Sequence, residues 1–164
     1  MMVKTHGKGV FIMYTENTCW SQSVAAVCIR EGKVLLARHT YGPGIGKLII
    51  PGGYIEKGEL PQDAVRREYM EEAGVVIEPK GVIGIRFSQK DWYVVFAADY
   101  VSGAARSDGD ENSEVVWMDT DEALLRDDVP ELTKKLIGCA LADHHFDVIP
   151  YKSTTTPFGL YGAK

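Results

Sequence analysis

The stretch Gly53-Tyr54-Ile55-Glu56-Lys57-Gly58-Glu59, followed by seven residues and then Arg67-Glu68-Tyr69-Met70-Glu71-Glu72-Ala73-Gly74-Val75, carries the strongest signal in this chain. Proline suits the first position of a helix and glycine its C-terminal end, so Pro61 and Gly74 bound a predicted helix. Residues three and four positions apart share a helical face, and Glu68, Glu71 and Glu72 therefore project together. Three carboxylates this close repel one another unless a cation holds them.

A second face of the predicted helix anchors it to a core, because Val65, Tyr69 and Ala73 recur every four residues. Mg²⁺ and Mn²⁺ prefer oxygen ligands, and Mg²⁺ commonly takes further oxygens from substrate phosphates. The helix is therefore interpreted as a divalent-metal platform in an enzyme that acts on phosphate. The alternative is a solvated acidic helix face, which is common in proteins.

The residues upstream of the helix favour the metal interpretation. Gly52 and Gly53 have no Cβ, so the backbone can approach a ligand closely there. Glu59 and Arg67 are expected to pair and to fix the preceding loop to the helix, since hydrogen bonds between arginine and carboxylate are strong and directional.

The composition indicates one compact globular domain. The chain has 164 residues, of which 45% are hydrophobic and 25% charged, enough for a single core. The net charge of -5 argues against DNA or RNA as the main partner, because nucleic acid is bound chiefly by clustered Lys and Arg. No apolar run reaches membrane-spanning length, and the N-terminus lacks the pattern of a signal peptide. With three scattered cysteines expected as free thiols, the predicted location is the cytoplasm.

Strand patterns lie on both sides of the acidic helix. A hairpin turn is expected at Glu31-Gly32, and two further helices are expected after Asp119 or Thr120 and from Pro130 onward. Without regular βαβ alternation, the fold class is α+β, or a mixed α/β/α sandwich. The expected divisions are an N-terminal strand and extension over 1–20, one domain over 21–146 and a tail over 147–164. The predicted strands cover residues 9–14, 22–30, 33–38, 48–50, 81–87, 92–101 and 114–118.

The segment from Gly53 to Val75 resembles the Nudix box, G-x5-E-x7-R-E-U-x-E-E-x-G-U, in which U is a bulky apolar residue. Every fixed position matches, and Tyr69 occupies a U position usually filled by an aliphatic residue. Together with the preceding Pro51-Gly52 and the surrounding strands, the resemblance extends from about Ser21 to His144. Leu48 stands where many members of the family have tryptophan.

The resemblance implies an α/β/α sandwich with a mixed sheet, in which the box forms a loop-helix-loop metal site. It also implies hydrolysis of a nucleoside diphosphate linked to another moiety, with Mg²⁺ or Mn²⁺ as cofactor. Glu68 and Glu72 would be the primary metal ligands, and Glu71 would bind directly or through water. The Gly52 carbonyl would be a further ligand, and the structural positions of the motif would be Gly53, Glu59, Arg67 and Gly74.

A further carboxylate is expected outside the box, because residues 110–117 resemble a loop that often supplies one. Glu111 is preferred over Glu114, since Glu111 lies in the predicted loop and Glu114 begins the predicted strand. The alternative is that both are surface acids. The general base stays open between Glu68 and this outer carboxylate.

Candidate substrate contacts are less specific. Arg38 and Arg86 could meet a phosphate or could be solvated charges at strand ends. Trp92 and Tyr93 could stack on a base or could be core aromatics. Three histidines show no partner pattern and are expected at the surface: His39, His144 and His145.

The leading hypothesis is a pyrophosphohydrolase for a small nucleotide such as a nucleoside triphosphate, ADP-ribose or a nucleotide sugar. Two alternatives are a nucleotide-binding sensor without hydrolysis, against which the intact glutamates count, and an RNA 5′-end pyrophosphohydrolase, against which the acidic charge counts. Three alternatives stay open for Thr154 to Phe158: packing over the domain, packing onto a second subunit of a homodimer, or disorder.

Overall fold

The computed structural model describes residues 3–5, 10–12, 21–88, 91–142, 145–148 and 161–162. The strand expected over 9–14 is the short β2 (Val10–Ile12), which pairs antiparallel with β1 (Val3–Thr5). Cys19, His144 and the segment Thr154 to Phe158 lie outside the described residues, so the expectations for them, including a homodimer through the tail, stay predictions.

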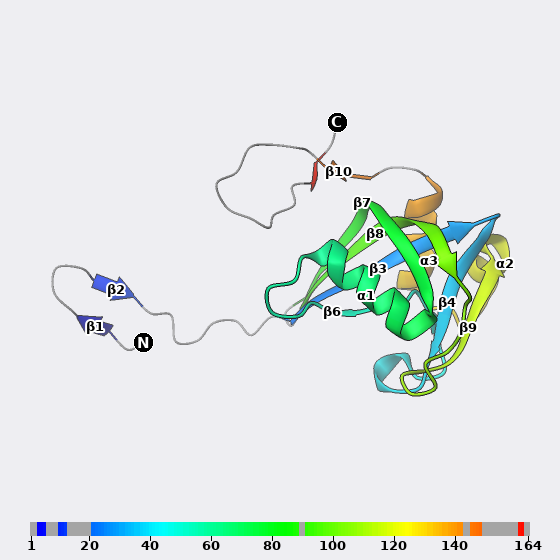
Figure 1. The fold of residues 1–164 in the computed structure, drawn as a ribbon, viewed down its shortest axis with the longest axis horizontal. Helices are drawn as coiled ribbons and strands as arrows, with labels where there is room; N and C mark the ends of the chain where they lie inside the picture. The colour runs from blue at the N-terminus through cyan, green and yellow to red at the C-terminus, as the bar shows by residue number, and fades with distance from the viewer. Residues whose placement is uncertain are drawn as a thin grey trace.

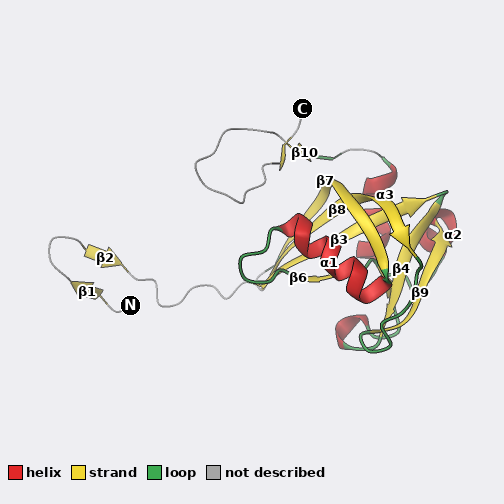
Figure 2. Ribbon diagram, in the orientation of Figure 1, coloured by secondary structure: helices red, strands yellow, loops and turns green. Residues whose placement is uncertain are grey.

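A mixed seven-stranded sheet forms the centre of the molecule (Figures 1 and 2). The order is β5-β4-β3-β8-β7, with β6 paired to β3 and β9 paired to β4. The β3–β8 pair is parallel, and the other pairs are antiparallel. The strands are β3 (Ser21–Arg30), β4 (Lys33–His39), β5 (Leu48–Ile49), β6 (Gly52–Tyr54), β7 (Val75–Phe87), β8 (Asp91–Gly103) and β9 (Asn112–Asp119).

Helices cover both faces of this sheet, with α1 in front and α3 behind in Figure 1. On β3, Val24 and Ala26 pack into the core beneath α1, whereas Ala25 and Val27 pack into the core beneath α3. This alternation is what two-sided burial of one strand requires, and it confirms the expected α/β/α sandwich. The remaining elements are α1 (Pro61–Ala73), α2 (Thr120–Leu125), α3 (Glu131–Leu141), a 3-10 turn η1 (Gly42–Gly44), β10 (Asp147–Val148) and β11 (Tyr161–Gly162).

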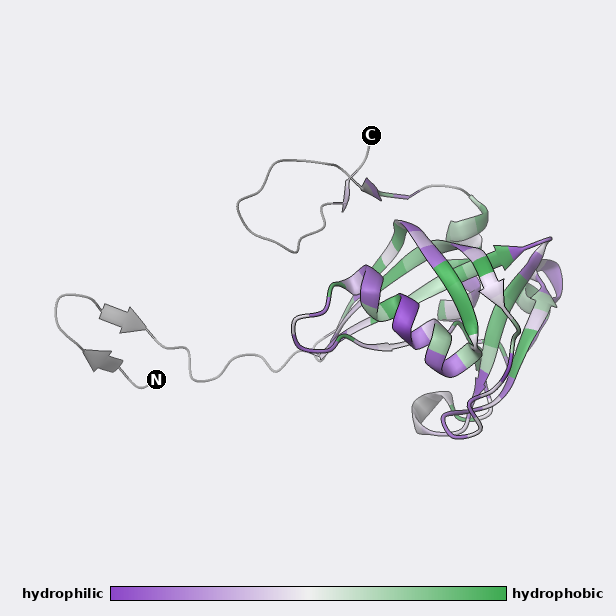
Figure 3. Ribbon diagram, in the orientation of Figure 1, coloured by the Kyte–Doolittle hydropathy of each residue, from purple (hydrophilic) through white to green (hydrophobic). Residues whose placement is uncertain are grey.

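Helix α1 has the predicted bounds and the predicted buried face. Gly74 ends it in the left-handed region with φ of 66°, and its N–H donates to the Met70 carbonyl at 3.1 Å. Val65, Tyr69 and Ala73 are fully buried, while polar positions colour the outer side of the helix in Figure 3. The helix therefore packs into the core with its apolar face and directs its polar face outward.

Other boundaries differ from the prediction. Strand β7 begins at Val75 rather than at residue 81, because a register shift between Pro79 and Gly81 lets the strand continue past the proline. On α3 the buried stripe is narrower than expected: Leu136 and Ile137 are buried, but Leu132 and Leu141 are exposed. None of the helices in the described part of the chain has the length and apolar character needed to cross a bilayer.

Candidate metal centre and substrate cavity

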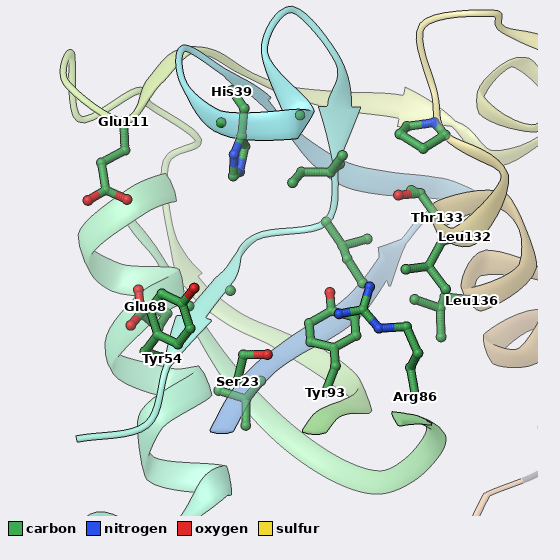
Figure 4. A pocket seen from close by; sticks show the side chains of 18 of the residues that line it. Ser23, His39, Tyr54, Glu68, Arg86, Tyr93, Glu111, Leu132, Thr133 and Leu136 are labelled. Atoms are coloured by element: carbon green, nitrogen blue, oxygen red, sulfur yellow. The ribbon is translucent and has the colours of Figure 1, made fainter. Parts of the chain in front are cut away.

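A cavity of about 740 Å³ opens between α1 and α3 (Figure 4). Its volume lies in the range of small-molecule sites. The two ends differ in chemistry, because Glu68 and Glu111 line one end and Arg86, Tyr93 and Leu136 line the other. The cavity therefore offers separate surroundings to the two parts of an elongated ligand.

Glu72 on α1 is deeply buried, with 3% of its surface exposed, and neither it nor Glu71 lines the cavity wall. Its carboxylate accepts a hydrogen bond from the Gly52 N–H at 3.0 Å, which ties α1 to β6. Burial, together with the negative charges of Glu68 and Glu111, raises the pKa of Glu72 to about 8, although the hydrogen bond from Gly52 opposes the shift. A cation would relieve this unfavourable burial of charge.

Glu68 lies one turn earlier on α1, against β6. Its pKa is also raised, chiefly by burial, although Arg67 opposes the shift. Its carboxyl group leaves no room on the neighbouring strand, because a Cβ added at Gly53 would lie 2.5 Å from the carboxyl carbon. At Gly52 an added Cβ would lie 2.2 Å from the Val24 carbonyl. Gly52 is therefore required by close packing of backbone on backbone, whereas a side chain at Gly53 would displace the end of the Glu68 side chain.

Arg67 connects the loop of the motif to the helix, as expected. Its Nε and Nη2 donate to the two Glu59 oxygens at 3.0 and 2.9 Å, and Nη2 also donates to the Tyr54 carbonyl. Its Nη1 bridges Glu68 at 2.8 Å and the more exposed Glu71 at 3.1 Å. The guanidinium thus neutralises part of the acidic face and limits where these carboxylates lie.

The outer carboxylate on the cavity is Glu111 and not Glu114. Glu111 lies in the loop before β9 and lines the cavity, where its Oε2 accepts a hydrogen bond from the Tyr41 hydroxyl at 3.0 Å. Glu114 lies on β9, and its carboxylate is paired with Arg38 at 2.8 Å.

The expected ligands are of the chemical type that a divalent cation prefers, but their side chains do not converge on one point. Within the described ranges, no three His, Cys, Asp or Glu side chains converge closely enough to hold a metal. The ion pairs give the physical reason. Carboxylates repel one another and spread apart, and the Arg67 guanidinium pairs with both Glu68 and Glu71. The donors are nevertheless carboxylate oxygens beside a buried, charge-disfavoured glutamate, which is the ligand type that Mg²⁺ and Mn²⁺ prefer.

The other end of the cavity combines a cation, an aromatic ring and apolar walls. Arg86 lies over the Tyr93 ring, with 5.1 Å between the guanidinium carbon and the ring centroid. Arg86 is also paired with Asp91. Figure 4 shows Arg86 and Tyr93 facing the α3 side chains across the cavity. The apolar walls come from Ile49, Ile50, Pro130, Leu132 and Leu136.

Two of the substrate candidates, Arg38 and Trp92, do not line this cavity. Arg38 is held by Glu114, by Asp128 at 3.0 Å and by the Gly46 carbonyl at 2.9 Å, and it is not part of the cavity wall. Trp92 packs edge-to-face on Phe87 with 5.1 Å between ring centroids. Adjacent residues of a strand point to opposite faces, so Tyr93 faces the cavity and Trp92 does not.

Three residues that line the cavity were not predicted as site residues: His39, Tyr41 and Tyr54. His39 was expected at the surface, but it is half-buried in the cavity wall and stacks on Tyr41 with 5.7 Å between ring centroids. Burial lowers the pKa of His39. Two signals were available, because Tyr54 lies within the motif and Tyr41 opens a glycine-rich loop. His145 pairs with Asp147 at 3.0 Å.

The sandwich and its acidic loop-helix-loop define a Nudix protein, and the comparisons agree. The NUDIX domain family model matches residues 20–137. This match covers well over half of the 164-residue chain, and the chain belongs to the Nudix family.

Several known proteins resemble this chain. An ADP-ribose pyrophosphatase from Methanocaldococcus jannaschii is 30% identical over 104 residues, covering 59% of this chain and 60% of that protein. An NAD-capped RNA hydrolase NudC from Haemophilus influenzae is 31% identical over 155 residues, covering 79% of this chain and 55% of that protein. The chain thus spans little more than half the length of these relatives. A solved NUDIX hydrolase from Nitrosomonas europaea has a TM-score of 0.69 at 22% identity, covering 83% of this chain and 99% of that one, which is a likeness of fold.

Proposed function

We propose that this protein is a Mg²⁺- or Mn²⁺-dependent pyrophosphohydrolase whose catalytic domain spans residues 21–146. The observation that supports it most is a cavity with carboxylates at one end and an arginine–tyrosine pair at the other. A diphosphate needs neutralisation where it is cut, and the groups attached to it need contacts of a different kind. The free thiol of the buried Cys28 suits a reducing compartment, and the cytoplasm is the proposed location.

In this proposal the acidic end holds the metal. Glu68 and Glu72 are the primary ligands, while the more exposed Glu71 joins directly or through water. The Gly52 carbonyl and Glu111 complete the set. When bound, the cation would neutralise the diphosphate and activate the attacking water.

The chain's own residues have separate tasks around that cation. Arg67 keeps Glu68 and the loop carboxylate Glu59 in fixed positions through its five hydrogen bonds to Glu59, Glu68, Glu71 and the Tyr54 carbonyl. Glu68 and Glu111 are the two candidates for the general base that takes a proton from water, since both carboxylates line the cavity. Gly53 keeps the strand close to Glu68 by having no side chain.

The substrate class is proposed from the second end of the cavity and from the named relatives. ADP-ribose and NAD both carry a diphosphate that joins an adenosine to a second ribose-containing group, and an aromatic and apolar end suits one of these halves. Tyr93 and Arg86 would hold a base or ribose there. A small nucleotide diphosphate of this kind is therefore favoured over a bare nucleoside triphosphate.

A second candidate is removal of an NAD-type 5′ end from RNA, which the names of several curated relatives favour. The net charge of -5 counts against a long polyanion as substrate. The alternative of a sensor that binds without hydrolysis is disfavoured by the intact set of glutamates.

A substrate panel tests the proposal. ADP-ribose, NADH, a nucleotide sugar, a nucleoside triphosphate, a dinucleoside polyphosphate and an NAD-capped RNA are incubated with Mg²⁺, with Mn²⁺ and with excess EDTA, and products are separated by chromatography. The expected result is metal-dependent release of mononucleotides from ADP-ribose or NADH. Tight nucleotide binding by calorimetry with no product from any substrate would contradict hydrolysis and favour the sensor.

A further inference from the structure

The loop that carries Glu111 is tied by hydrogen bonds to Thr40 and Tyr41, which directly follow β4. The Thr40 N–H donates to the Glu111 carbonyl at 3.0 Å. The Thr40 hydroxyl lies 2.7 Å from the Asp110 carbonyl and 2.9 Å from the Glu111 carbonyl. The bond from the Tyr41 hydroxyl to Glu111 Oε2 at 3.0 Å is the one that reaches the carboxylate. Thr40 therefore holds the main chain of the loop, and Tyr41 holds its functional group.

Tyr41 is itself braced although half of its surface is exposed. Its ring stacks on His39 at an interplanar angle of 27°. His39 is fixed in turn, because its N–H donates to the Lys47 carbonyl at 3.1 Å and its carbonyl accepts from the Gly46 N–H at 2.8 Å. The Tyr41 ring thus stacks on a residue whose backbone is held by the loop that contains η1.

We propose that Tyr41 is a positioning residue that holds the Glu111 carboxylate at the cavity. An exposed glutamate otherwise samples many rotamers, and ordering it from solution opposes metal binding and water activation. The hydrogen bond fixes the carboxylate before any ligand arrives. This inference rests on the proposed function, because it requires Glu111 to act on the metal or on the attacking water.

A double-mutant cycle tests the inference with the intact protein and the substrate found by the panel. Tyr41→Phe keeps the stacked ring and removes the hydroxyl, and it is expected to lower kcat about 10-fold with little change in KM. In the Glu111→Gln background the same change is expected to cost less than about 2-fold, because the group it positions is already altered. An equal loss in both backgrounds, or no loss with wild-type Glu111, would overturn the inference.

Metal affinity supplies a readout without substrate. Mn²⁺ titration followed by electron paramagnetic resonance is expected to give weaker binding, by about 3-fold, in Tyr41→Phe and in Glu111→Gln alike. Weaker binding in Glu111→Gln with unchanged binding in Tyr41→Phe would contradict the positioning role. Unchanged kcat and Mn²⁺ affinity in Glu111→Gln would instead remove Glu111, and with it this inference, while leaving hydrolysis by the box glutamates standing.

The matched control is Tyr100→Phe. Tyr100 also donates its hydroxyl to an oxygen, the Gly103 carbonyl at 2.8 Å, but it lies outside the cavity wall. Its kcat and Mn²⁺ affinity are expected to equal those of the wild-type protein. A loss in Tyr100→Phe equal to that in Tyr41→Phe would show a general effect of losing a tyrosine hydroxyl and would overturn the inference.

Discussion

Gly53 illustrates how one residue shapes the candidate metal centre by what it lacks. The two oxygens of the Glu68 carboxylate would lie 2.5 and 2.6 Å from a Cβ at this position. With glycine at position 53 the Glu68 carboxylate occupies this space, and a methyl group there would force the end of the Glu68 side chain to move. The demand for glycine here comes from contact with Glu68.

Gly53→Ala is therefore expected to displace Glu68 and to reduce kcat on the order of 10²-fold, because small misplacements of a catalytic group have large effects. Steady-state kinetics and Mn²⁺ titration measure the change. Gly138→Ala on α3 is the matched control, since a Cβ there meets nothing within 4 Å. It is expected to retain activity and to gain about 0.5–1 kcal/mol in the free energy of unfolding. Wild-type kcat in Gly53→Ala would contradict the close-contact argument.

Tyr69 is a residue whose burial could be predicted from the sequence but whose hydrogen bond could not. Its burial was predictable from its spacing with Val65 and Ala73. Its hydroxyl, however, donates to the Ala26 carbonyl on β3 at 2.5 Å. That partner is 43 residues away, and no local pattern names it. A tyrosine is tolerated at an aliphatic position because its polar end has a partner.

At the scale of elements, Asp128 joins β4 to the connection between α2 and α3. Arg126 donates to it at 2.7 and 2.8 Å, and Arg38 donates at 3.0 Å. These two cations, Arg126 first, lower the pKa of Asp128 well below its ordinary value of 3.8. The pKa is lower in the folded protein than in the unfolded chain, so the stabilisation is fully present above about pH 4 and is lost as the pH falls further.

Asp128→Asn is expected to lower the free energy of unfolding at pH 7 by about 1 kcal/mol, a value kept small because solvent screens the pair. The difference from wild type should shrink as the pH falls below about 4. Urea denaturation at several pH values measures it, with the exposed neighbour variant Asp127→Asn as control. A difference that grows toward low pH would show that the sign is wrong.

The elements differed in how well the sequence predicted them. Helix α1 was predictable because its buried face, its initial proline and its final glycine agree. Strand β7 was predicted too short, since a proline inside a strand normally argues against pairing; β7 stands at the end of the strand order and its register shifts beside Pro79, and both features accommodate the proline. The hairpin at Glu31-Gly32 was predictable, and both residues have positive φ, of 52° and 75°.

At the scale of the whole molecule, the cavity joins elements that are distant in the sequence. Its wall runs from Ser23 on β3 to Leu136 on α3. The box glutamates were predictable because they lie within one helix. Three features depend on pairings across the sheet, such as the parallel β3–β8 pair, which sequence periodicity does not reveal. They are the orientation of Tyr93 into the cavity, the ion pairs that hold Arg38 away from it, and the hydrogen bond from Tyr41 to Glu111.

The carboxylate platform of α1 is the central claim, and Glu72→Gln tests it most directly. The amide keeps the shape of a buried side chain whose pKa is raised to about 8, so the protein is expected to stay folded with wild-type circular dichroism and no loss of thermal stability at pH 7. Turnover of the substrate found by the panel, at saturating Mg²⁺, is expected to fall at least on the order of 10³-fold. Wild-type turnover in folded Glu72→Gln protein would contradict the assignment of this helix as the metal platform.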